Sequence, residues 1–276
     1  MLKPNKHKGQ HWLISKKYLK KIVESAQINP GEVILEIGPG TGNLTEELLK
    51  SEAQIIAIEK DRDLIKFLLT KLSPVPLTKT KTLHEFAIAN SCINASADLQ
   101  IIEGDILKFD ETKINPPYKI VANIPYYITG PIIQKFLRSA NPPTEMILLV
   151  QKEVGERICA QPPRANYLSA LVQSLAETKL LFGVKKENFW PKPKVDSVVI
   201  KITPLGIKHS VFDMESFMDF LKMVFKQPRQ TLANNLKRGK LAKETIDNVF
   251  IKLKIPKNTR PQNLDCEKLM RMFRNI

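Results

Sequence analysis

Apolar runs alternate with helical patterns between about residues 20 and 205, and Gly or Pro separates most of them. Short runs rich in β-branched residues predict buried strands, and apolar residues three or four positions apart predict amphipathic helices. The predicted strands are 33–37, 55–58, 99–102, 120–122 and 146–150. The predicted helices are 17–26, 43–50 and 61–72, with others after the last two strands. This alternation predicts an α/β fold with a mostly parallel sheet.

The pattern changes near the end of this region. Residues 195–202 alternate apolar and polar side chains, which predicts an antiparallel edge strand. Beyond Pro204 only helices are predicted, at 212–225, 231–236, 243–253 and 266–273, so we expect two domains, 1–205 and 206–276. Residues 73–98 fit no regular period until a short helix predicted at 84–89, and we interpret them as a surface insertion.

Positive charge is concentrated at the two ends of the chain. The 276 residues include 43 Lys and Arg against 28 Asp and Glu, a net charge of +15. Residues 1–30 carry 7 basic and 1 acidic side chains, residues 206–276 carry 15 and 7, and the middle is almost neutral with 21 and 20. Terminal concentrations of this kind are typical of surfaces that contact a phosphate backbone, whereas a basic protein without such a partner would scatter its charge.

Other classes of protein are less favoured. An anionic membrane is the rival partner, but no stretch approaches the roughly 20 apolar residues of a spanning helix. The N-terminus lacks the apolar core of a signal peptide, so a cytoplasmic location is expected. The three cysteines, Cys92, Cys159 and Cys266, and the four histidines lack the spacing of a disulfide framework or a metal site, and we expect no metal.

A glycine-rich turn, EIGPGTG at 36–42, joins a predicted strand to a predicted helix. Glycines at 38, 40 and 42 let the backbone approach a ligand closely and adopt positive φ. A dinucleotide fingerprint would have its third glycine at position 43, which is Asn43. The Glu36 carboxylate would repel a pyrophosphate but attract an ammonium or sulfonium group. Both features favour S-adenosylmethionine over NAD as the cofactor, with Glu36, Gly38, Gly40 and Gly42 as binding residues.

Two further acids follow strands of the same predicted sheet. Glu59 ends the second strand, where a carboxylate can accept both hydroxyls of a ribose. Asp105 follows the third strand and is placed to accept a hydrogen bond from an adenine amino group. For either acid alone, a solvated residue at a strand end is an equally good interpretation. The ordered set of a glycine turn and two acids favours a cofactor site.

The sequence Asn123-Ile124-Pro125-Tyr126 follows the fourth strand, at the sheet edge where ligands bind in such folds. The exocyclic amine of adenine is a poor nucleophile because its lone pair is delocalised into the ring. The Asn123 side-chain oxygen and the Ile124 carbonyl can accept its N–H groups and favour the localised lone pair. Pro125 stiffens the turn, and Tyr126 offers a face for base stacking. A tight turn with a core tyrosine is the structural alternative.

Phe189 opens the segment FWPKPKVDS at 189–197, which its prolines hold extended. An aromatic side chain there could close a sandwich over a base extruded from its strand. Packing against the prolines is the alternative, and the residue alone does not decide between the two.

Five ordered motifs resemble one family, the ribosomal RNA adenine N6-dimethyltransferases, and most closely the bacterial small-subunit type. They are GQHWL at 9–13, EIGPGTG at 36–42, NIPY at 123–126, QKEV at 151–154 and FWPKPKVDS at 189–197. The resemblance covers nearly the whole chain. Three departures are Trp12, where the family usually has Phe, the insertion at 73–98, and the segment 226–232, where Pro228 and Gln230 replace two cations.

The resemblance implies a class I methyltransferase sheet with an antiparallel last strand, a small all-α C-terminal domain that binds RNA, and a monomer. It implies transfer of methyl groups from S-adenosylmethionine to two adjacent adenines near the 3′ end of 16S rRNA, in the immature small ribosomal subunit. The matching cofactor contacts are His11, Leu13, Gly38, Glu59, Asp105 and Asn123. The target base would be held by Asn123, Tyr126 and Phe189, with the Ile124 carbonyl.

Three other functions remain open at this point. A 23S rRNA methyltransferase that confers antibiotic resistance shares the catalytic motifs, although the C-terminal segments resemble the small-subunit type better. A ribosome-assembly factor with little catalysis would share the RNA-binding surface. A mitochondrial transcription-factor relative is disfavoured because no transit peptide precedes Gly9.

Overall fold

The computed structural model describes residues 10–72, 92–96, 98–206 and 213–276, and the chain divides into two compact units. The first consists of Met1–Lys152 and Leu180–Thr203, and the second of Glu153–Lys179 and Pro204–Ile276. The expected domain 1–205 is therefore wrong for residues 153–179. The reason lies in a helix that the sequence pattern did not reveal, α6 (Tyr167–Gln173), whose Ala170 and Leu171 are buried in one cluster with Phe217 of the C-terminal helices.

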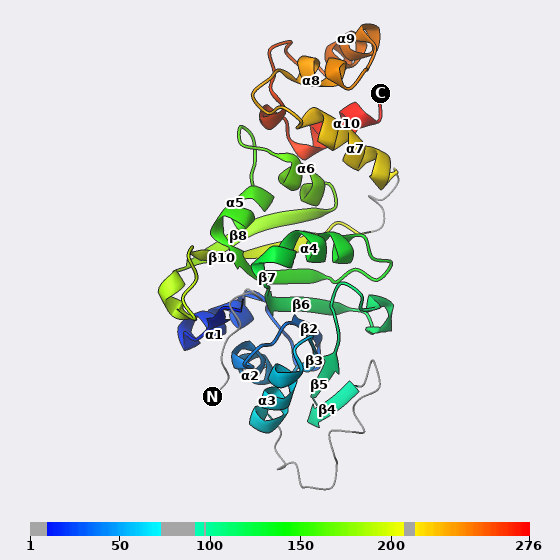
Figure 1. Ribbon diagram of the computed structural model, residues 1–276. Helices are drawn as coiled ribbons and strands as arrows, with labels where there is room; N and C mark the ends of the chain where they lie inside the picture. The colour runs from blue at the N-terminus through cyan, green and yellow to red at the C-terminus, as the bar shows by residue number, and fades with distance from the viewer. Residues whose placement is uncertain (1–9, 73–91, 97, 207–212) are drawn as a thin grey trace. The chain divides into compact units, whose positions relative to one another are not determined.

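The first unit is built on a sheet with the strand order β4-β5-β3-β2-β6-β7-β10-β8 (Figure 1). Its central strands are parallel and end at one edge: β5 (Leu99–Glu103), β3 (Gln54–Glu59), β2 (Val33–Ile37), β6 (Tyr118–Asn123) and β7 (Glu145–Gln151). The carboxyl ends of parallel strands lie at one edge of a sheet. The turn after β2, Glu59 and Asn123 therefore lie at the same edge of this sheet. The predicted mostly parallel α/β fold is confirmed.

The outer strands differ from the sequence prediction. The strand β10 (Ser197–Pro204) pairs antiparallel with β7, as predicted, but it is not an edge strand, because β8 (Ala176–Val184) lies beyond it. The pattern of β8 is hard to recognise since it has charged residues and is exposed on both faces. At the other edge, β4 (Cys92–Ser96) pairs with β5 inside the predicted insertion. The helix predicted at 84–89 lies outside the described residues.

Three helices pack on one face of the sheet: α1 (Lys16–Ser25), α2 (Asn43–Leu49) and α3 (Arg62–Leu72). Their buried residues, such as Leu48 and Leu68, share one cluster with Ile34 and Val121 of the strands. A fourth helix, α4 (Thr129–Leu137), buries Ile132, Ile133 and Phe136 outside this cluster. The helices α1, α2 and α3 begin and end within two residues of their predicted ranges.

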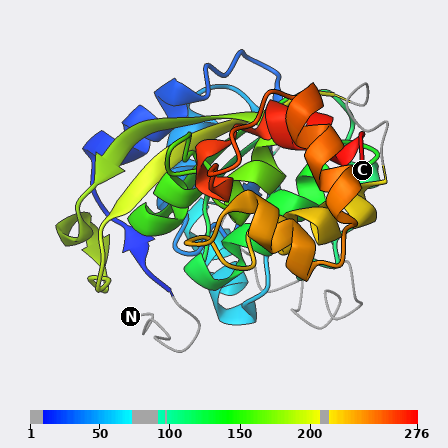
Figure 2. The ribbon, with the colours of Figure 1, turned by 90° about the horizontal axis from the view of Figure 1, so that it is seen from above.

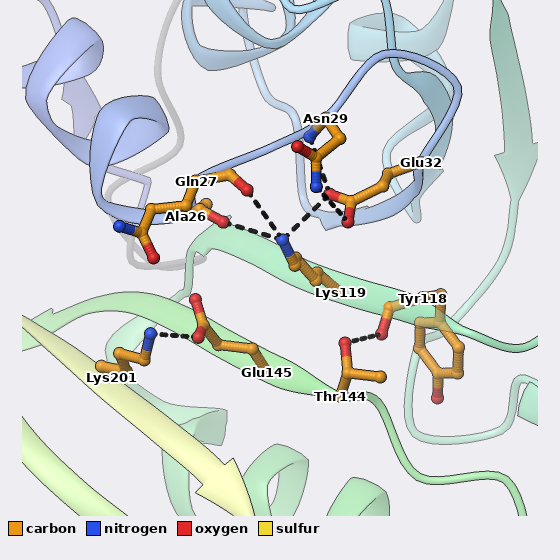
Figure 3. A network of polar contacts seen from close by, with 9 residues as sticks. All are labelled: Ala26, Gln27, Asn29, Glu32, Tyr118, Lys119, Thr144, Glu145 and Lys201. Carbon is orange, nitrogen blue, oxygen red and sulfur yellow. Dashed lines mark hydrogen bonds and ion pairs between the residues drawn. The ribbon is translucent and has the colours of Figure 1, made fainter.

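A half-buried lysine ties helix α1 to the amino end of strand β6 (Figure 3). The Lys119 ammonium donates to the carbonyls of Ala26 and Gln27, both at 3.0 Å, and pairs with the Glu32 carboxylate at 2.9 Å. Glu32 in turn accepts a bond from the Asn29 backbone. The network satisfies carbonyls at the end of α1 and fixes the loop that leads into β2.

The second unit is helical: α5 (Lys152–Ile158, whose first residue belongs to the first unit), α6, α7 (Met214–Val224), α8 (Leu232–Arg238), α9 (Lys243–Lys252) and α10 (Cys266–Phe273). The last four run from yellow to red in Figures 1 and 2. Asp213, Thr231 and Asp265 accept backbone N–H bonds at the starts of α7, α8 and α10. The four predicted C-terminal helices are confirmed within two residues.

Candidate active site

The glycine turn after β2 has the backbone that its sequence predicts. Gly38, Gly40 and Gly42 have φ of +64°, +58° and +76°, which side chains with a Cβ rarely adopt. A Cβ on Gly40 would stand 2.8 Å from the indole nitrogen of Trp12, and one on Gly42 would stand 2.7 Å from a methyl group of Leu68. The N-terminal segment therefore lies directly on the turn and forms one wall of a cleft above it.

Glu59 also lines this cleft. Its carboxylate accepts the backbone N–H of Gly40 at 3.2 Å and those of Lys60 and Asp61 at 2.8 and 2.9 Å. Burial raises the pKa of Glu59, and the three backbone donors oppose that effect. Each carboxylate oxygen has more than one lone pair, so the side chain is rigidly held and can still accept hydroxyl groups of a ligand.

Glu36, the last but one residue of β2, is a buried carboxylate that lines the same cleft. It is 1% exposed, and burial, with the nearby Glu59 charge, raises its pKa to about 8. Its Oε2 atom has no hydrogen-bond partner among the described residues. A buried acceptor without a partner is costly unless a ligand satisfies it, and a cationic ligand would favour its ionised form.

Asp105 lines the cleft on the side of β5. One carboxylate oxygen pairs with the Lys60 ammonium at 2.9 Å, and the other accepts the Leu107 N–H at 3.0 Å. The Lys60 hydrogen bond lowers the pKa of Asp105, so the carboxylate is ionised near neutral pH. Asp105, the predicted acceptor for an adenine amine, is thus in the cleft, and one of its oxygens already binds Lys60. Lys60 was not among the predicted site residues.

Asn123 and Ile124 present two oxygen acceptors at the end of β6. The Asn123 amide nitrogen donates to the His11 carbonyl at 3.1 Å, which turns the amide so that its oxygen is directed elsewhere. Neither that oxygen nor the Ile124 carbonyl accepts a hydrogen bond from the residues that the structure describes. Ile124 is itself anchored by its N–H to Leu149 of β7 at 3.3 Å.

Tyr126 is held from two sides. Its hydroxyl and the hydroxyl of Ser197 are 2.8 Å apart, and its ring is stacked on the His11 imidazole with the ring centres 5.9 Å apart. The His11 Nδ1 atom donates to the Pro191 carbonyl at 2.8 Å. Ser197 is fully buried at the start of β10, and burial raises the pKa of Tyr126. The sequence motif contained Ser197, but nothing in it indicated this bond.

These groups surround one cleft of about 470 Å³ at the carboxyl edge of the sheet. The predicted site residues that line it are His11, Leu13, Glu36, Gly38, Gly40, Glu59, Asp105, Asn123, Ile124, Pro125 and Tyr126. Gly42 shapes the turn without lining the cleft. Tyr127 also lines it and is 68% exposed, which the sequence analysis missed.

Phe189 is not in the cleft, contrary to the expectation that it covers a base. It lies in β9 (Phe189–Trp190), which pairs antiparallel with β1 (Trp12–Leu13). Its side chain is 3% exposed and belongs to the hydrophobic cluster under α1 and α2. Because successive strand residues point to opposite faces, Phe189 faces the core and Trp190 faces solvent. A base can stack on Phe189 only if that side chain leaves the core.

The described residues contain no cluster of three or more His, Cys, Asp or Glu side chains that could hold a metal ion. Every helix among the same residues is too short or too polar to span a bilayer.

Comparisons with known proteins point to one family. The family model described as ribosomal RNA adenine dimethylase matches residues 1–276. A protein of Lactobacillus johnsonii named ribosomal RNA small subunit methyltransferase A is 36% identical over 97% of this chain and 88% of its own length. A protein of the same name from Rippkaea orientalis is 36% identical over the whole chain and 98% of its own length.

Solved structures agree in fold. A dimethyladenosine transferase from Plasmodium falciparum has a TM-score of 0.74 and 26% identity over 94% of this chain and 95% of its own. The 23S rRNA methyltransferase ErmE has a TM-score of 0.70 and 22% identity over 96% of this chain and 98% of its own, which supports the fold alone.

Proposed function

The chain belongs to the ribosomal RNA adenine dimethylase family, and we propose that it methylates N6 of two adjacent adenines near the 3′ end of 16S rRNA with S-adenosylmethionine. Its activity is that of an rRNA adenine dimethyltransferase. The observation that carries the finer proposal is the pair of acceptors at Asn123 and Ile124. Both residues line the same cleft as the glycine turn, where an amine and a methyl donor would meet.

The residues of the cleft suit S-adenosylmethionine, which supplies a methyl group on a positively charged sulfur when bound. Glu36 has a buried oxygen without a partner, which favours a cationic ligand. Glu59 is fixed by three backbone donors and would accept the ribose hydroxyls. Gly38 and Gly40 have no Cβ atoms, so the ligand can approach the backbone of the turn closely at these two positions.

Asn123 and Ile124 would act on the adenine. Their oxygens accept the two N–H groups of N6 and draw its lone pair out of conjugation with the ring, so that the nitrogen becomes a better nucleophile. Because His11 holds the Asn123 nitrogen, the oxygen is directed before substrate arrives and no reorientation is needed. Tyr126, with its hydroxyl fixed by Ser197, offers a ring face for the base.

The second unit supports an RNA substrate larger than the target nucleotides. One of its pockets is lined by Lys222, Lys226 and Arg238 together with Met223 and Gly239. Lys222 pairs with Asp219 at 2.8 Å, whereas Lys226 has no ion-pair partner in the described part of the chain. Cations around one hollow are suited to phosphate groups. We infer that this unit binds rRNA in the immature small subunit, and that the enzyme works as a cytoplasmic monomer.

Small-subunit RNA is favoured over 23S RNA as the substrate. The curated relatives that match 96–100% of the chain at 34–36% identity bear the small-subunit name, whereas the 23S enzyme is 22% identical. A role in subunit assembly is compatible with catalysis and would depend on the same RNA-binding surfaces.

The test is to incubate the protein with labelled S-adenosylmethionine and either immature small subunits or large subunits, and then to map the methylated nucleotides. The proposal expects dimethylation of two adjacent adenines near the 3′ end of 16S rRNA. Modification of 23S rRNA alone, or of other positions, would contradict it. The Asn123→Ala variant serves as the control for background label.

A further inference from the structure

The two tryptophans of the chain, Trp12 and Trp190, lie side by side. They are paired across the β1–β9 ribbon, with ring centres 5.5 Å apart and an angle of 34° between the rings. Trp12 is 9% exposed and lines the cleft against Gly40. Trp190 is 47% exposed and does not line the cleft. A half-exposed aromatic side chain thus lies beside a residue of the cleft wall.

The surroundings of Trp190 are tied closely to the reacting groups. The next residue, Pro191, accepts a hydrogen bond from the His11 ring, and the His11 carbonyl accepts one from Asn123. Two hydrogen bonds through one residue therefore connect the backbone beside Trp190 to the acceptor of the target amine. A group that stacks on Trp190 would lie next to the cleft and not inside it.

Positive charge accompanies the exposed ring. Lys192 and Lys194 follow Trp190 within four positions, and both side chains are exposed. Lys192 pairs with Glu187 at 2.9 Å, whereas Lys194 has no ion-pair partner among the residues that the structure describes. An aromatic face with lysines beside it is the combination that binds single-stranded nucleic acid, with the ring against a base and the cation near a phosphate.

We propose that Trp190 stacks on the base of the nucleotide next to the target adenine in the bound RNA. The inference rests on the proposed function and extends it to a second nucleotide. When a target base turns out of its strand into a pocket, its neighbour loses a stacking partner. Trp190 replaces that partner at the mouth of the cleft, and the stack holds the strand in place while the amine is bound at Asn123 and Ile124.

A binding experiment tests the stack directly. Single-stranded RNA of eight nucleotides with two adjacent adenines is titrated into the cofactor-free enzyme, and binding is followed by tryptophan fluorescence. The wild type should be quenched, and the Trp190→Phe variant, in which Trp12 is the remaining tryptophan, should lose most of that quenching with little loss of affinity. Trp190→Ala should weaken RNA binding about tenfold, the range of one base stack.

Abasic RNA identifies the stacked nucleotide. The base is removed from the nucleotide on one side of the target adenine or on the other. At the nucleotide that stacks on Trp190, this removal should weaken RNA binding by the wild type about tenfold and should not weaken RNA binding by Trp190→Ala any further. Phe67→Ala is the matched control, because Phe67 is an exposed aromatic residue on α3 that does not line the cleft, and this variant should bind like the wild type.

Several results would overturn the stack. The first is an unchanged RNA affinity in Trp190→Ala, and the second is an RNA affinity of Trp190→Phe as low as that of Trp190→Ala. The third is a loss of affinity in Trp190→Ala that is equally large with the abasic RNA. The fourth is an equal loss of affinity for S-adenosylmethionine, which would indicate that Trp190 only supports Trp12. If Trp190→Ala methylates rRNA as well as the wild type, only this inference fails. If the wild type methylates no rRNA adenine, the proposed function fails and the inference fails with it.

Discussion

The side-chain nitrogen of Asn123 donates a hydrogen bond to the backbone carbonyl of His11 at 3.1 Å, across 112 positions of sequence. An amide can present either its nitrogen or its oxygen to a ligand, and only the oxygen accepts an amine N–H. By holding the nitrogen, the N-terminal segment decides which end of Asn123 is free. The N-terminal segment therefore orients Asn123 as well as lining the cleft.

Glu36→Gln should change both stability and its dependence on pH. The carboxylate has a reference pKa of 4.5 and a pKa of about 8 in the folded protein. Between these values the folded state binds more protons than the unfolded state, so the contribution of Glu36 to stability falls as pH rises. Glutamine does not titrate, and thermal unfolding should show the variant gaining on the wild type from about pH 5 to pH 8. A constant difference in melting temperature would contradict the buried carboxylate.

The same variant tests the ligand of Glu36. A cationic ligand binds best to the ionised carboxylate, so wild-type affinity for S-adenosylmethionine should rise with pH toward about 8. The Glu36→Gln variant should bind S-adenosylmethionine more weakly and lack this rise in affinity. Titration of the ligand itself affects both proteins equally, so the comparison of the two corrects for it. Calorimetry at several pH values measures both. Equal pH profiles would show that Glu36 does not face the cation.

Ser197→Ala and Tyr126→Phe should have the same effect as each other. Each removes one side of the 2.8 Å bond that fixes the tyrosine ring. A bond of this kind contributes about 1 kcal/mol, so KM for RNA should rise about fivefold while affinity for the cofactor stays unchanged. The double variant should be no worse than either single one, because both remove one interaction. Additive losses would show that the two hydroxyls act separately.

Lys119→Met should destabilise the first unit without impairing the cleft. The change removes an ammonium with three partners at the amino end of β6 and leaves Glu32 without its cation (Figure 3). We expect a loss of about 2 kcal/mol, a fall of about 5 °C in melting temperature. Lys50→Met is the control, because the exposed Lys50–Glu47 pair contributes little. A loss of methylation activity in Lys119→Met, measured well below its melting temperature, would show that Lys119 also affects the cleft and would contradict this prediction.

Most elements of the first unit were predictable because their apolar residues follow one period. The strand β2 has five apolar or buried residues in succession, and the turn after it is marked by glycines. The strand β8 was missed since Glu177 and Lys179 interrupt its pattern and its faces are partly exposed. The helix α6 was missed because its buried residues look, in sequence, like those of the sheet region before it. Their packing with the C-terminal helices depends on the tertiary fold.

The site was predictable where one motif brings the residues together. Asn123, Ile124 and Tyr126 are neighbours in sequence, and Glu59 is placed by the end of its strand. Phe189 was misplaced because a strand of two residues shows no alternation from which to tell its inner from its outer face. The contacts of His11 with Asn123 and Pro191 depend on the tertiary fold, and no local pattern contains them.

The most direct test of the account is a comparison of single-turnover methylation with cofactor affinity in Asn123→Ala. The substitution removes the oxygen that we propose accepts the target amine, and loss of one preorganised hydrogen-bonding group at a reacting centre costs about 100- to 1,000-fold in rate. We expect a rate loss of that size with a change of at most about threefold in the Kd for S-adenosylmethionine. Equal losses of rate and affinity, or a rate close to that of the wild type, would contradict the role of Asn123 at N6.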